Sequence, residues 1–384
     1  MGRLKNMQIV FDSNKTVFSS GDVIRGKVFL QVDRSDHVGL KTVQKMWMQF
    51  RGKAKTDWST DDHTHSLTEM YFDETVIIFK PGKRSQNLHV PPGRHSYPFE
   101  FKLPRKNLPA TFEGKYGYVR YKAKATVSLK RTLLDKEFRT KRLFSMRGPT
   151  LDLNNIPEAK LAVNAKADAH NWCGCTLMVS DEISVGLSKQ GYVPGESIVV
   201  TGQVDNRDST ERITLYSKLL QIITFHSKSH QEVKKNTLAT VSASVACPRG
   251  RVTDFSIGPL RIPPVPPSGL PGCGIIDVLY RVQILSANRE TNFTIQVGNV
   301  PLKIPATRTR VETELPPYPG EQPNAAVACE TPPPTYEEAA AMSGLIPKDR
   351  SGENYFASSE QFVPSYPYFS LLVEDGQSET RLDQ

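Results

Sequence analysis

The sequence predicts an all-β protein made of two similar β-sandwiches in tandem, followed by a disordered tail that contains proline motifs. Three observations predict this class. Short segments alternate apolar and polar residues with a period of two, the second half of the chain repeats the landmarks of the first, and both patterns end near residue 307. We therefore expect domains at residues 1–155 and 170–306 and a tail at residues 307–384.

The first domain shows its strand pattern clearly after the turn at residues 19–22. The apolar positions of the following segment fall on one face of a strand: Ile24, Val28, Leu30 and Val32. A second segment, residues 121–130, alternates small or apolar residues with lysines at positions 122, 124 and 130. Because successive side chains of a strand point to opposite faces, this domain should carry a basic outer face. Residues 151–170 have mixed polarity, and we expect them to cross between the domains.

The second domain repeats this order of glycine, proline and tyrosine. Its segment Val200, Gly202 and Val204 corresponds to Ile24, Gly26 and Val28. Farther along, a strand that ends in proline precedes a strand with an inward tyrosine in both halves, at Tyr121 and at Tyr280. Such a repeat predicts two sandwiches of the same construction.

The tail carries one strong candidate for partner binding, the PPxY sequence Pro333-Pro334-Thr335-Tyr336. Consecutive prolines favour a polyproline II helix, which the aromatic grooves of WW domains bind at little further entropic cost. Tyr336 supplies an aromatic ring for a second pocket. The alternative interpretation is a spacer in which the prolines only prevent collapse.

Weaker copies of this motif lie on either side of it. The first is Leu315-Pro316-Pro317-Tyr318 and the second is Val363-Pro364-Ser365-Tyr366. Several motifs on one tail would raise the avidity for a partner with several WW domains. In addition, Tyr368 and Leu371 fit the YxxΦ pattern of endocytic sorting signals, a pattern that chance also produces often.

The charge is unevenly divided along the chain. The net charge is +9 overall and −10 for residues 311–384, so residues 1–310 carry +19. A basic body suits an anionic partner such as an acidic peptide or an anionic membrane surface. No RNA-binding or DNA-binding signature accompanies the charge, and we expect no nucleic-acid partner. The chain has no run of 18 apolar residues and no secretory signal, which predicts a cytosolic or nuclear protein.

The sequence lacks the usual signatures of an enzyme or of a metal site. No G-x-S-x-G, P-loop, H-E-x-x-H or G-x-G-x-x-G sequence occurs, so we expect no turnover and no cofactor. The five cysteines show no disulfide spacing and are expected to be free thiols. Cys173 and Cys175 with His170 lack a fourth zinc ligand, and no metal is expected there.

Taken together, these pieces resemble the α-arrestins, or arrestin domain-containing proteins, over nearly the whole chain. The residues that carry the resemblance are residues 17–28 and 111–121 in the first domain, residues 189–196 and 297–302 in the second, and residues 331–339 in the tail. The resemblance implies two immunoglobulin-like sandwiches in an arrestin fold. Residues 104–113 are too short and too proline-broken for the amphipathic helix of visual and β-type arrestins, which indicates the α branch.

The resemblance also implies a function. Such an adaptor recruits Nedd4-type HECT ubiquitin ligases through PPxY motifs to the cytosolic regions of membrane receptors or transporters, promoting ubiquitination, endocytosis and endosomal sorting. Pro333, Pro334 and Tyr336 match the family motif, whereas the copies at Leu315 and Val363 depart from it. The implied location is cytoplasmic and peripheral at the plasma membrane and endosomes.

An alternative function is a redox scaffold. One member of the family binds thioredoxin through a cysteine in a loop of its second domain, and Cys247 falls in the comparable loop with different neighbours. The competing interpretation is that Cys247 is an inert thiol.

Overall fold

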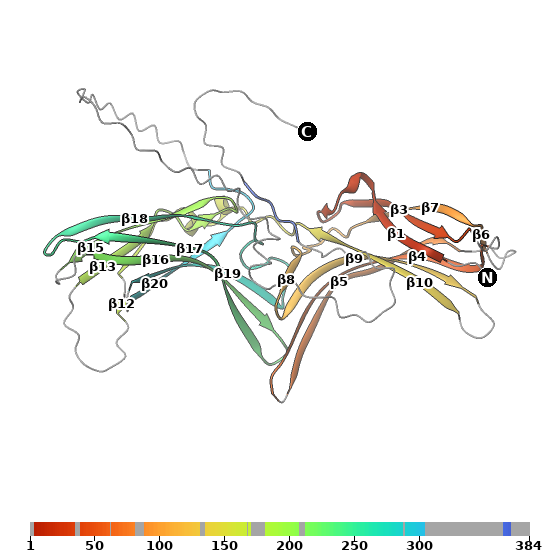
Figure 1. The fold of residues 1–384 in the computed structure, drawn as a ribbon, viewed down its shortest axis with the longest axis horizontal. Coiled ribbons are helices and arrows are strands. Elements are labelled where there is room, and N and C mark those ends of the chain that lie inside the picture. The colour runs from red at the N-terminus through yellow and green to blue at the C-terminus, as the bar shows by residue number, and fades with distance from the viewer. Residues whose placement is uncertain are drawn as a thin grey trace, which may run out of the picture.

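The computed structural model describes residues 4–34, 39–61, 63–80, 88–130, 135–166, 168–169, 181–206, 212–286, 289–303 and 364–369. Within these ranges the chain forms two β-sandwiches that lie side by side along the long axis of the molecule (Figure 1). The helical elements of this part are three short 3-10 helices: η1 (Asp12–Asn14), η2 (Leu153–Asn155) and η3 (Pro157–Lys160). The predicted all-β class is confirmed.

The first sandwich contains a three-stranded sheet with the order β1-β3-β7 and a larger sheet with the order β2-β10-β9-β4-β5, onto which β6 and β8 are added. Its strands are β1 (Leu4–Phe11), β2 (Val17–Phe18), β3 (Val23–Val32), β4 (Leu40–Ser59), β5 (Thr64–Phe79), β6 (Leu88–Val90), β7 (Gly93–Lys102), β8 (Phe112–Gly114), β9 (Gly117–Leu129) and β10 (Lys136–Met146).

The second sandwich pairs a sheet of the order β11-β13-β15-β18 with a sheet of the order β12-β20-β19-β16-β17, and β14 is added to β20. Its strands are β11 (Val163–Lys166), β12 (Asp168–Ala169), β13 (Asp181–Leu187), β14 (Gly191–Tyr192), β15 (Ser197–Asn206), β16 (Arg212–His226), β17 (Gln231–Ala246), β18 (Val252–Arg261), β19 (Ile276–Ser286) and β20 (Arg289–Val297).

The alternation of buried and more exposed residues along the strands explains which side chains form the two cores. In β3 every second side chain is buried, from Ile24 to Val32, and the residues between are exposed except at the partly buried start of the strand. Along β9, Tyr121, Ala123 and Ala125 are buried, and the lysines between them lie on the other face. Full burial of one large aliphatic side chain contributes about 1.5–3 kcal/mol, so such a strand has one stable register.

The predicted repeat is present at the level of single hydrogen bonds. The Tyr121 hydroxyl donates to the carbonyl of Pro109 at 2.8 Å, and the Tyr280 hydroxyl donates to the carbonyl of Pro266 at 2.7 Å. In both sandwiches a side-chain hydroxyl also accepts a hydrogen bond from the final residue of the last strand. Met146 N–H donates to Thr111 Oγ1 and Val297 N–H donates to Ser268 Oγ, each at 2.8 Å.

The crossing between the sandwiches is shorter than expected. Residues 151–160 form the crossing with η2 and η3, but β11 already pairs with β13 in the second sandwich. This sandwich therefore begins before residue 170, inside the segment expected to be the crossing. The four residues of β11 offer two inward positions, Val163 and Ala165, too few to show an alternation. Residues 104–113 contain no helix, as the sequence predicted.

Two long hairpins meet where the sandwiches adjoin. The β4–β5 and β16–β17 hairpins project to the same side of the molecule (Figure 1). Near their tips the rings of His65 and His230 lie 4.5 Å apart, and His65 stacks on Trp58. Thr56 Oγ1 donates a hydrogen bond to the carbonyl of His226 at 2.6 Å. These contacts join one sandwich to the other.

Candidate functional site

Four of the candidate binding or redox residues that the sequence suggests lie in the described part of the chain. They are Pro364, Tyr366, Tyr368 and Cys247. The remaining candidates lie outside the described residues: Leu315, Pro316, Tyr318, Pro333, Pro334, Tyr336, Val363 and Leu371.

Residues 364–369 of the tail lie across both sandwiches. The Ser365 N–H donates to Ser145 Oγ at 3.2 Å, and the Tyr366 hydroxyl donates to the carbonyl of Thr111 at 2.8 Å, both in the first sandwich. At the other end, the Phe369 N–H donates to the carbonyl of Pro194 in the second sandwich at 3.0 Å. Pro364 is buried. The segment, blue in Figure 1, thus spans the junction between the domains.

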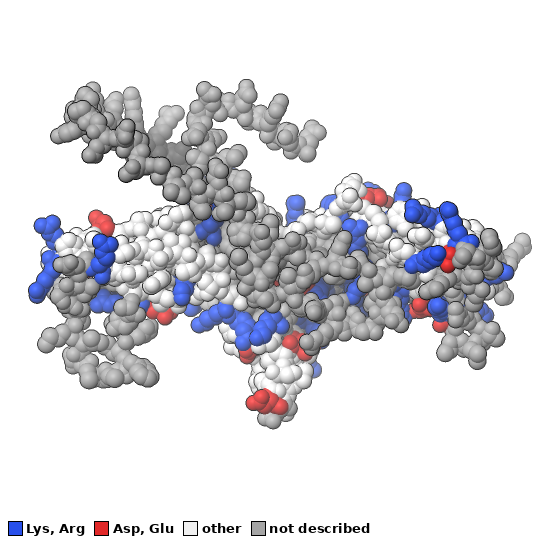
Figure 2. All heavy atoms as spheres, viewed as in Figure 1, with Lys and Arg blue, Asp and Glu red and all other residues white. Residues whose placement is uncertain are grey.

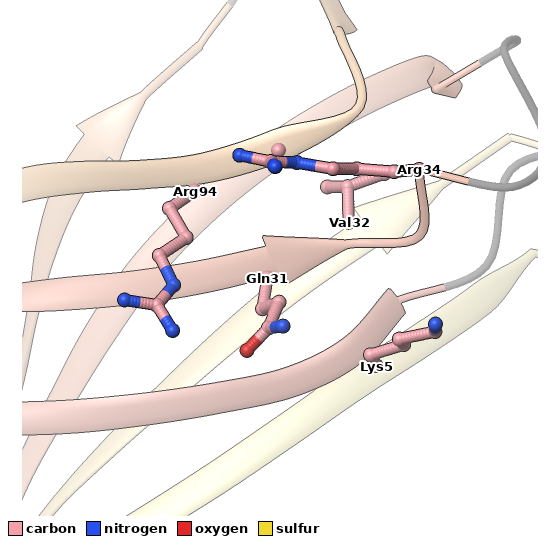
Figure 3. A pocket seen from close by; sticks show the side chains of 6 residues that line it. Lys5, Gln31, Val32, Arg34 and Arg94 are labelled. Atoms are coloured by element: carbon pink, nitrogen blue, oxygen red, sulfur yellow. The ribbon is translucent and has the colours of Figure 1, made fainter.

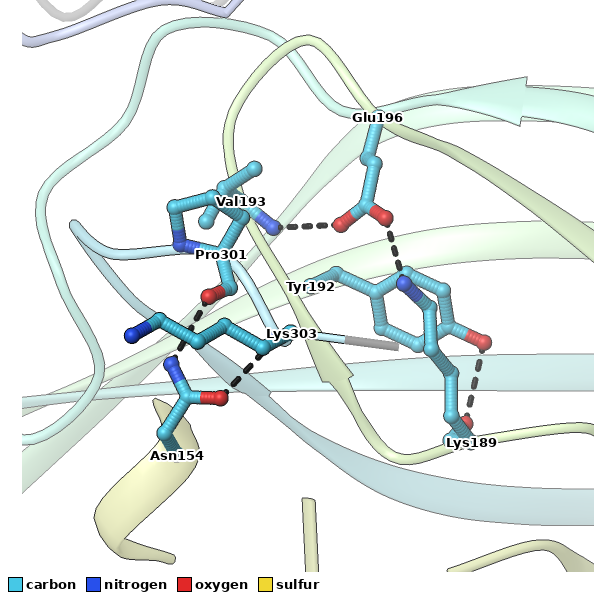
Figure 4. Close-up of polar contacts among 7 residues, drawn as sticks. All are labelled: Asn154, Lys189, Tyr192, Val193, Glu196, Pro301 and Lys303. Carbon is cyan, nitrogen blue, oxygen red and sulfur yellow. Dashed lines mark hydrogen bonds and ion pairs between the residues drawn. The ribbon is translucent and has the colours of Figure 1, made fainter. Parts of the chain in front are cut away.

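The turn that receives Phe369 is held by an ion pair (Figure 4). Glu196 accepts the Val193 N–H at 2.9 Å with one carboxylate oxygen and pairs with Lys189 through the other. The two side chains are only 15% and 18% exposed, so solvent screens this pair less than a surface pair. Residues 189–196 are one of the segments that carry the family resemblance, and their local role is to shape this turn.

Phe369 packs against an apolar cluster that includes residues of the crossing segment. Asn154 in η2 donates to the carbonyl of Pro301 and accepts the Lys303 N–H, both at 2.9 Å (Figure 4). Close to these bonds, a small apolar cluster collects side chains from the crossing, the turn, the end of the second sandwich and the tail: Leu153, Ile156, Ala159, Val193, Leu302 and Phe369.

The first sandwich has an equivalent turn, but a different residue packs against it. Asp22 accepts the Ser19 N–H at 3.1 Å and pairs with Lys15 at 2.9 Å, as Glu196 does with Val193 and Lys189. Burial opposes ionisation of Asp22, but the hydrogen bonds from Lys15 and Ser19 outweigh it and lower the pKa of the carboxyl. Here the side chain of Arg105 lies against Gly21, where the second sandwich has the backbone of Phe369 against Gly195.

A half-buried thiol, Cys273, and a half-buried phenol, Tyr71, lie near the junction. Glu69 accepts the Gly274 N–H at 2.8 Å across the domains, and the Tyr71 hydroxyl donates to Glu69 at 3.3 Å. Burial raises the pKa of the Cys273 thiol. Burial, together with the neighbouring Cys273 and Glu69, raises the pKa of Tyr71 as well. Both groups therefore stay neutral in the physiological range.

The predicted basic face is present on the large sheet of the first sandwich. Lys122 on β9 lies opposite Arg51 on β4, and Lys124 lies opposite Lys141 on β10. Burial and the neighbouring cations, Lys53 among them, lower the pKa of Lys122. Arg51 also pairs with Asp73 at 2.6 Å, but the cations outnumber this carboxylate, so the excess positive charge of the face would attract an anion.

A second basic surface lies at the far end of the three-stranded sheet. A hollow of about 310 Å³ is lined by Lys5 on β1, Gln31 on β3, Arg94 on β7, and Arg34 just after β3 (Figure 3). Lys5 pairs with Asp33 at 2.9 Å. Figure 2 shows Lys and Arg gathered over this end of the first sandwich and beside the β16–β17 hairpin.

The Cys247 side chain is buried, at 0% exposure, directly after β17. Its backbone carbonyl accepts a hydrogen bond from the Asn206 side chain. Thiol exchange requires a thiolate that reaches the partner's sulfur, so this environment disfavours the redox alternative and favours a packing role. Within the described residues, the structure brings together no group of three His, Cys, Asp or Glu side chains for a metal, and none of its helices could span a bilayer.

Sequence reasoning missed the docking of the tail. The local patterns at Val363 and Tyr368 fit free peptide signals, and nothing in them points to Thr111, Ser145 or Pro194. One usable signal was present: an uncharged run, rich in aromatics, at positions 361–373 within an acidic tail, which includes the docked residues 364–369.

Comparison with known proteins agrees with this architecture. The family model "Arrestin (or S-antigen), N-terminal domain" matches residues 7–146, and "Arrestin (or S-antigen), C-terminal domain" matches residues 182–307. The chain is 29% identical over 321 residues to arrestin domain-containing protein 17 of Caenorhabditis elegans, covering 78% of this chain and 72% of that protein. It is 24% identical over 346 residues to human arrestin domain-containing protein 1, covering 90% and 75%.

The human arrestin domain-containing protein 4 is a further relative, 25% identical over 296 residues that cover 74% of this chain and 67% of that protein. Both domain matches coincide with the two sandwiches, and the relatives share one name. The chain therefore belongs to the arrestin family, in the α-arrestin branch of arrestin domain-containing proteins.

Proposed function

We propose that this α-arrestin is a non-enzymatic adaptor that recruits WW-containing HECT ubiquitin ligases to membrane proteins. The observation that carries the proposal is the sequence Pro333-Pro334-Thr335-Tyr336 in the segment that follows two folded arrestin domains. The prolines pre-set an extended ligand for an aromatic groove, and the tyrosine fills a neighbouring pocket. Recruited ligase would ubiquitinate the protein held by the sandwiches and direct it to endocytosis and endosomal sorting.

The two sandwiches supply the other half of the proposal. The basic face around Lys122 and the hollow lined by Arg34 and Arg94 offer positive charge from one domain. Acidic cytosolic regions of receptors or transporters, and the anionic leaflet beneath which they lie, complement that charge. This adaptor would work from the cytoplasm at the plasma membrane and on endosomes.

Calorimetric titration of the full chain with a tandem WW fragment of a HECT ligase tests the ligase half. Changing Pro333, Pro334 and Tyr336 together to Ala removes the ring that acts as the anchor. Loss of an interface anchor typically costs 2 kcal/mol or more, so we expect the affinity to fall by about 30-fold or more.

The matched control is the same triple change in the weaker copy, at Pro316, Pro317 and Tyr318, for which we expect a much smaller loss. If the affinity of the Pro333 variant equals that of the unaltered chain, the proposed recruitment of the ligase is wrong. If only the Pro316 variant loses affinity, the motif has been assigned to the wrong copy.

A further inference from the structure

The surface that residues 364–369 occupy is built from rigid elements of both domains. On the first sandwich, Ser145 lies in β10 and pairs with Val17, and the Thr111 N–H donates to the carbonyl of Met146 at 3.0 Å. On the second sandwich, the Lys189–Glu196 pair holds the turn that presents the Pro194 carbonyl. The acceptors for the tail are therefore fixed by contacts within the body, which reduces the entropy lost when a peptide binds.

The shape of the receiving turn also fits the tail backbone closely. Gly195 has φ +97°, and a Cβ at this position would overlap the carbonyl oxygen of Phe369. Glycine thus serves two needs here, because it adopts this left-handed conformation without strain and leaves room for a second backbone. The equivalent Gly21, at φ +83°, would meet only the flexible side chain of Arg105, at 3.0 Å.

The docked segment hides the groups by which its tyrosines would be recognised. The Tyr366 hydroxyl is engaged by the Thr111 carbonyl, and Pro364 is buried. The Tyr368 hydroxyl is also buried, and within the described residues it has no hydrogen-bond partner. A groove for PPxY-like peptides or YxxΦ signals needs the ring and hydroxyl of the same residues.

We propose that the junction of the two sandwiches is a peptide-binding site whose ligand is the chain's own segment 364–369. In the docked state this segment links the two domains and withholds Tyr366 and Tyr368 from partners. A partner that binds either tyrosine has to bind the released segment, so its apparent affinity is the intrinsic affinity multiplied by the fraction of molecules in which the segment is free. The docking itself does not depend on the proposed recruitment of a ligase.

Hydrogen exchange of the full chain, read at residues 364–369, tests the docking. The Ser365 and Phe369 amides donate hydrogen bonds to the body, so we expect them to exchange at least about tenfold more slowly than in a synthetic peptide of the same sequence. Changing Tyr366 and Phe369 together to Ala removes the Tyr366–Thr111 hydrogen bond and the apolar packing of the Phe369 ring without changing a residue of the body. The Ser365 amide should then exchange at a rate close to that in the matching peptide.

Gly195→Ala tests the receiving side, with two matched controls. Gly93 has φ +126° and Gly250 has φ +70°, and a Cβ at either position meets nothing within 4 Å. The φ angles of the two controls lie on either side of that of Gly195, so alanine at these positions introduces comparable backbone strain. Neither control touches the docked tail. We expect loss of protection at residues 365 and 369 in Gly195→Ala and retained protection in Gly93→Ala and Gly250→Ala.

Two results would overturn the proposal. The first is exchange of the Ser365 and Phe369 amides at peptide rates in the unaltered chain. The second is unchanged protection of the Ser365 amide in the Tyr366 and Phe369 variant, which decides the matter even if Gly195→Ala fails to fold. Because exchange needs no ligase, a negative result here leaves the recruitment proposal standing, and loss of recruitment leaves the docking standing.

Discussion

Single residues reveal the duplication most clearly. Tyr121 and Tyr280 occupy equivalent strands and donate their hydroxyl to equivalent proline carbonyls. Gly26 and Gly202 each have a backbone carbonyl of the neighbouring strand and a phenylalanine ring, Phe99 or Phe255, where a Cβ would lie. These positions were identified in the sequence because glycine and tyrosine recurred in the same order. The contacts explain why those residue types are needed.

Removing the tyrosine hydroxyls should destabilise both sandwiches. Tyr121→Phe leaves the buried Pro109 carbonyl without its donor, and we expect a loss of about 1–3 kcal/mol in the free energy of unfolding. Tyr280→Phe should cost more, because this hydroxyl also accepts a hydrogen bond from the Gln221 side chain at 3.2 Å. Chemical denaturation measures both values. Tyr216→Phe, at a residue that is 44% exposed, is the control and should change little.

The Cys273 thiol should make stability depend on pH in the alkaline range. Because burial raises its pKa in the folded chain above the ordinary value of 9.0, the unfolded chain loses this proton first. The contribution of the thiol to stability is complete below pH 9 and is lost as the pH rises through the folded pKa.

The difference in unfolding free energy between the unaltered chain and Cys273→Ala should therefore narrow between pH 8 and pH 10. Above the ordinary pKa the slope approaches about 1.4 kcal/mol per pH unit. Denaturation curves of both proteins at pH 8, 9 and 10 measure it. A constant difference would mean that the thiol ionises in the folded chain as it does in the unfolded chain.

At the scale of elements, strands were easier to predict than connections. Alternation marked β3 and β9 because burial on one face requires apolar residues at every second position. β11 was missed because four residues hold too few inward positions, and the docked tail was missed because its contacts join residues more than 170 positions apart. Patterns of neighbouring residues do not indicate contacts between segments that are so far apart in the sequence.

The two ion-paired turns allow a matched comparison. Glu196→Gln removes the charge that pairs with Lys189, and since both side chains are mostly buried we expect a cost of about 1–3 kcal/mol. Asp22→Asn removes the equivalent charge from a more exposed pair, with side chains 52% and 34% exposed, and should cost less than about 1 kcal/mol.

Hydrogen exchange adds a second readout for these variants. Glu196→Gln should speed exchange at Phe369, because the turn that presents the Pro194 carbonyl loses its support. Asp22→Asn should leave Phe369 unaffected. An equal effect of both substitutions on Phe369 would contradict the role assigned to the Glu196 turn.

At the scale of the whole molecule, the sequence predicted two domains but not how they meet. The rings of His65 and His230, the Thr56–His226 bond and the tail join surfaces that belong to different halves of the repeat. A sequence repeat predicts two similar domains. The alternation of apolar and polar residues within each domain is explained by the core of that domain alone. The relative position of the sandwiches therefore could not be derived from periodicity.

The positive charge of the body should act at membranes through the first sandwich. Each basic residue near an anionic surface contributes about 1 kcal/mol, so Arg34→Ala with Arg94→Ala should weaken binding to phosphatidylserine vesicles by about 30-fold at low salt. Vesicle sedimentation measures the binding. Arg249→Ala with Arg251→Ala, in the exposed turn between β17 and β18, is the matched control. Equal losses in both pairs would indicate attraction by net charge without a preferred face.

Capture of the full chain from cells, with mass spectrometry of the bound proteins, tests most directly whether one molecule connects a ligase with a membrane protein. With Pro333, Pro334 and Tyr336 changed to Ala, we predict that HECT ligases disappear from the captured set while receptors or transporters remain. Ligases retained at the level of the unaltered chain, or ligases and membrane proteins lost together, would contradict the adaptor account.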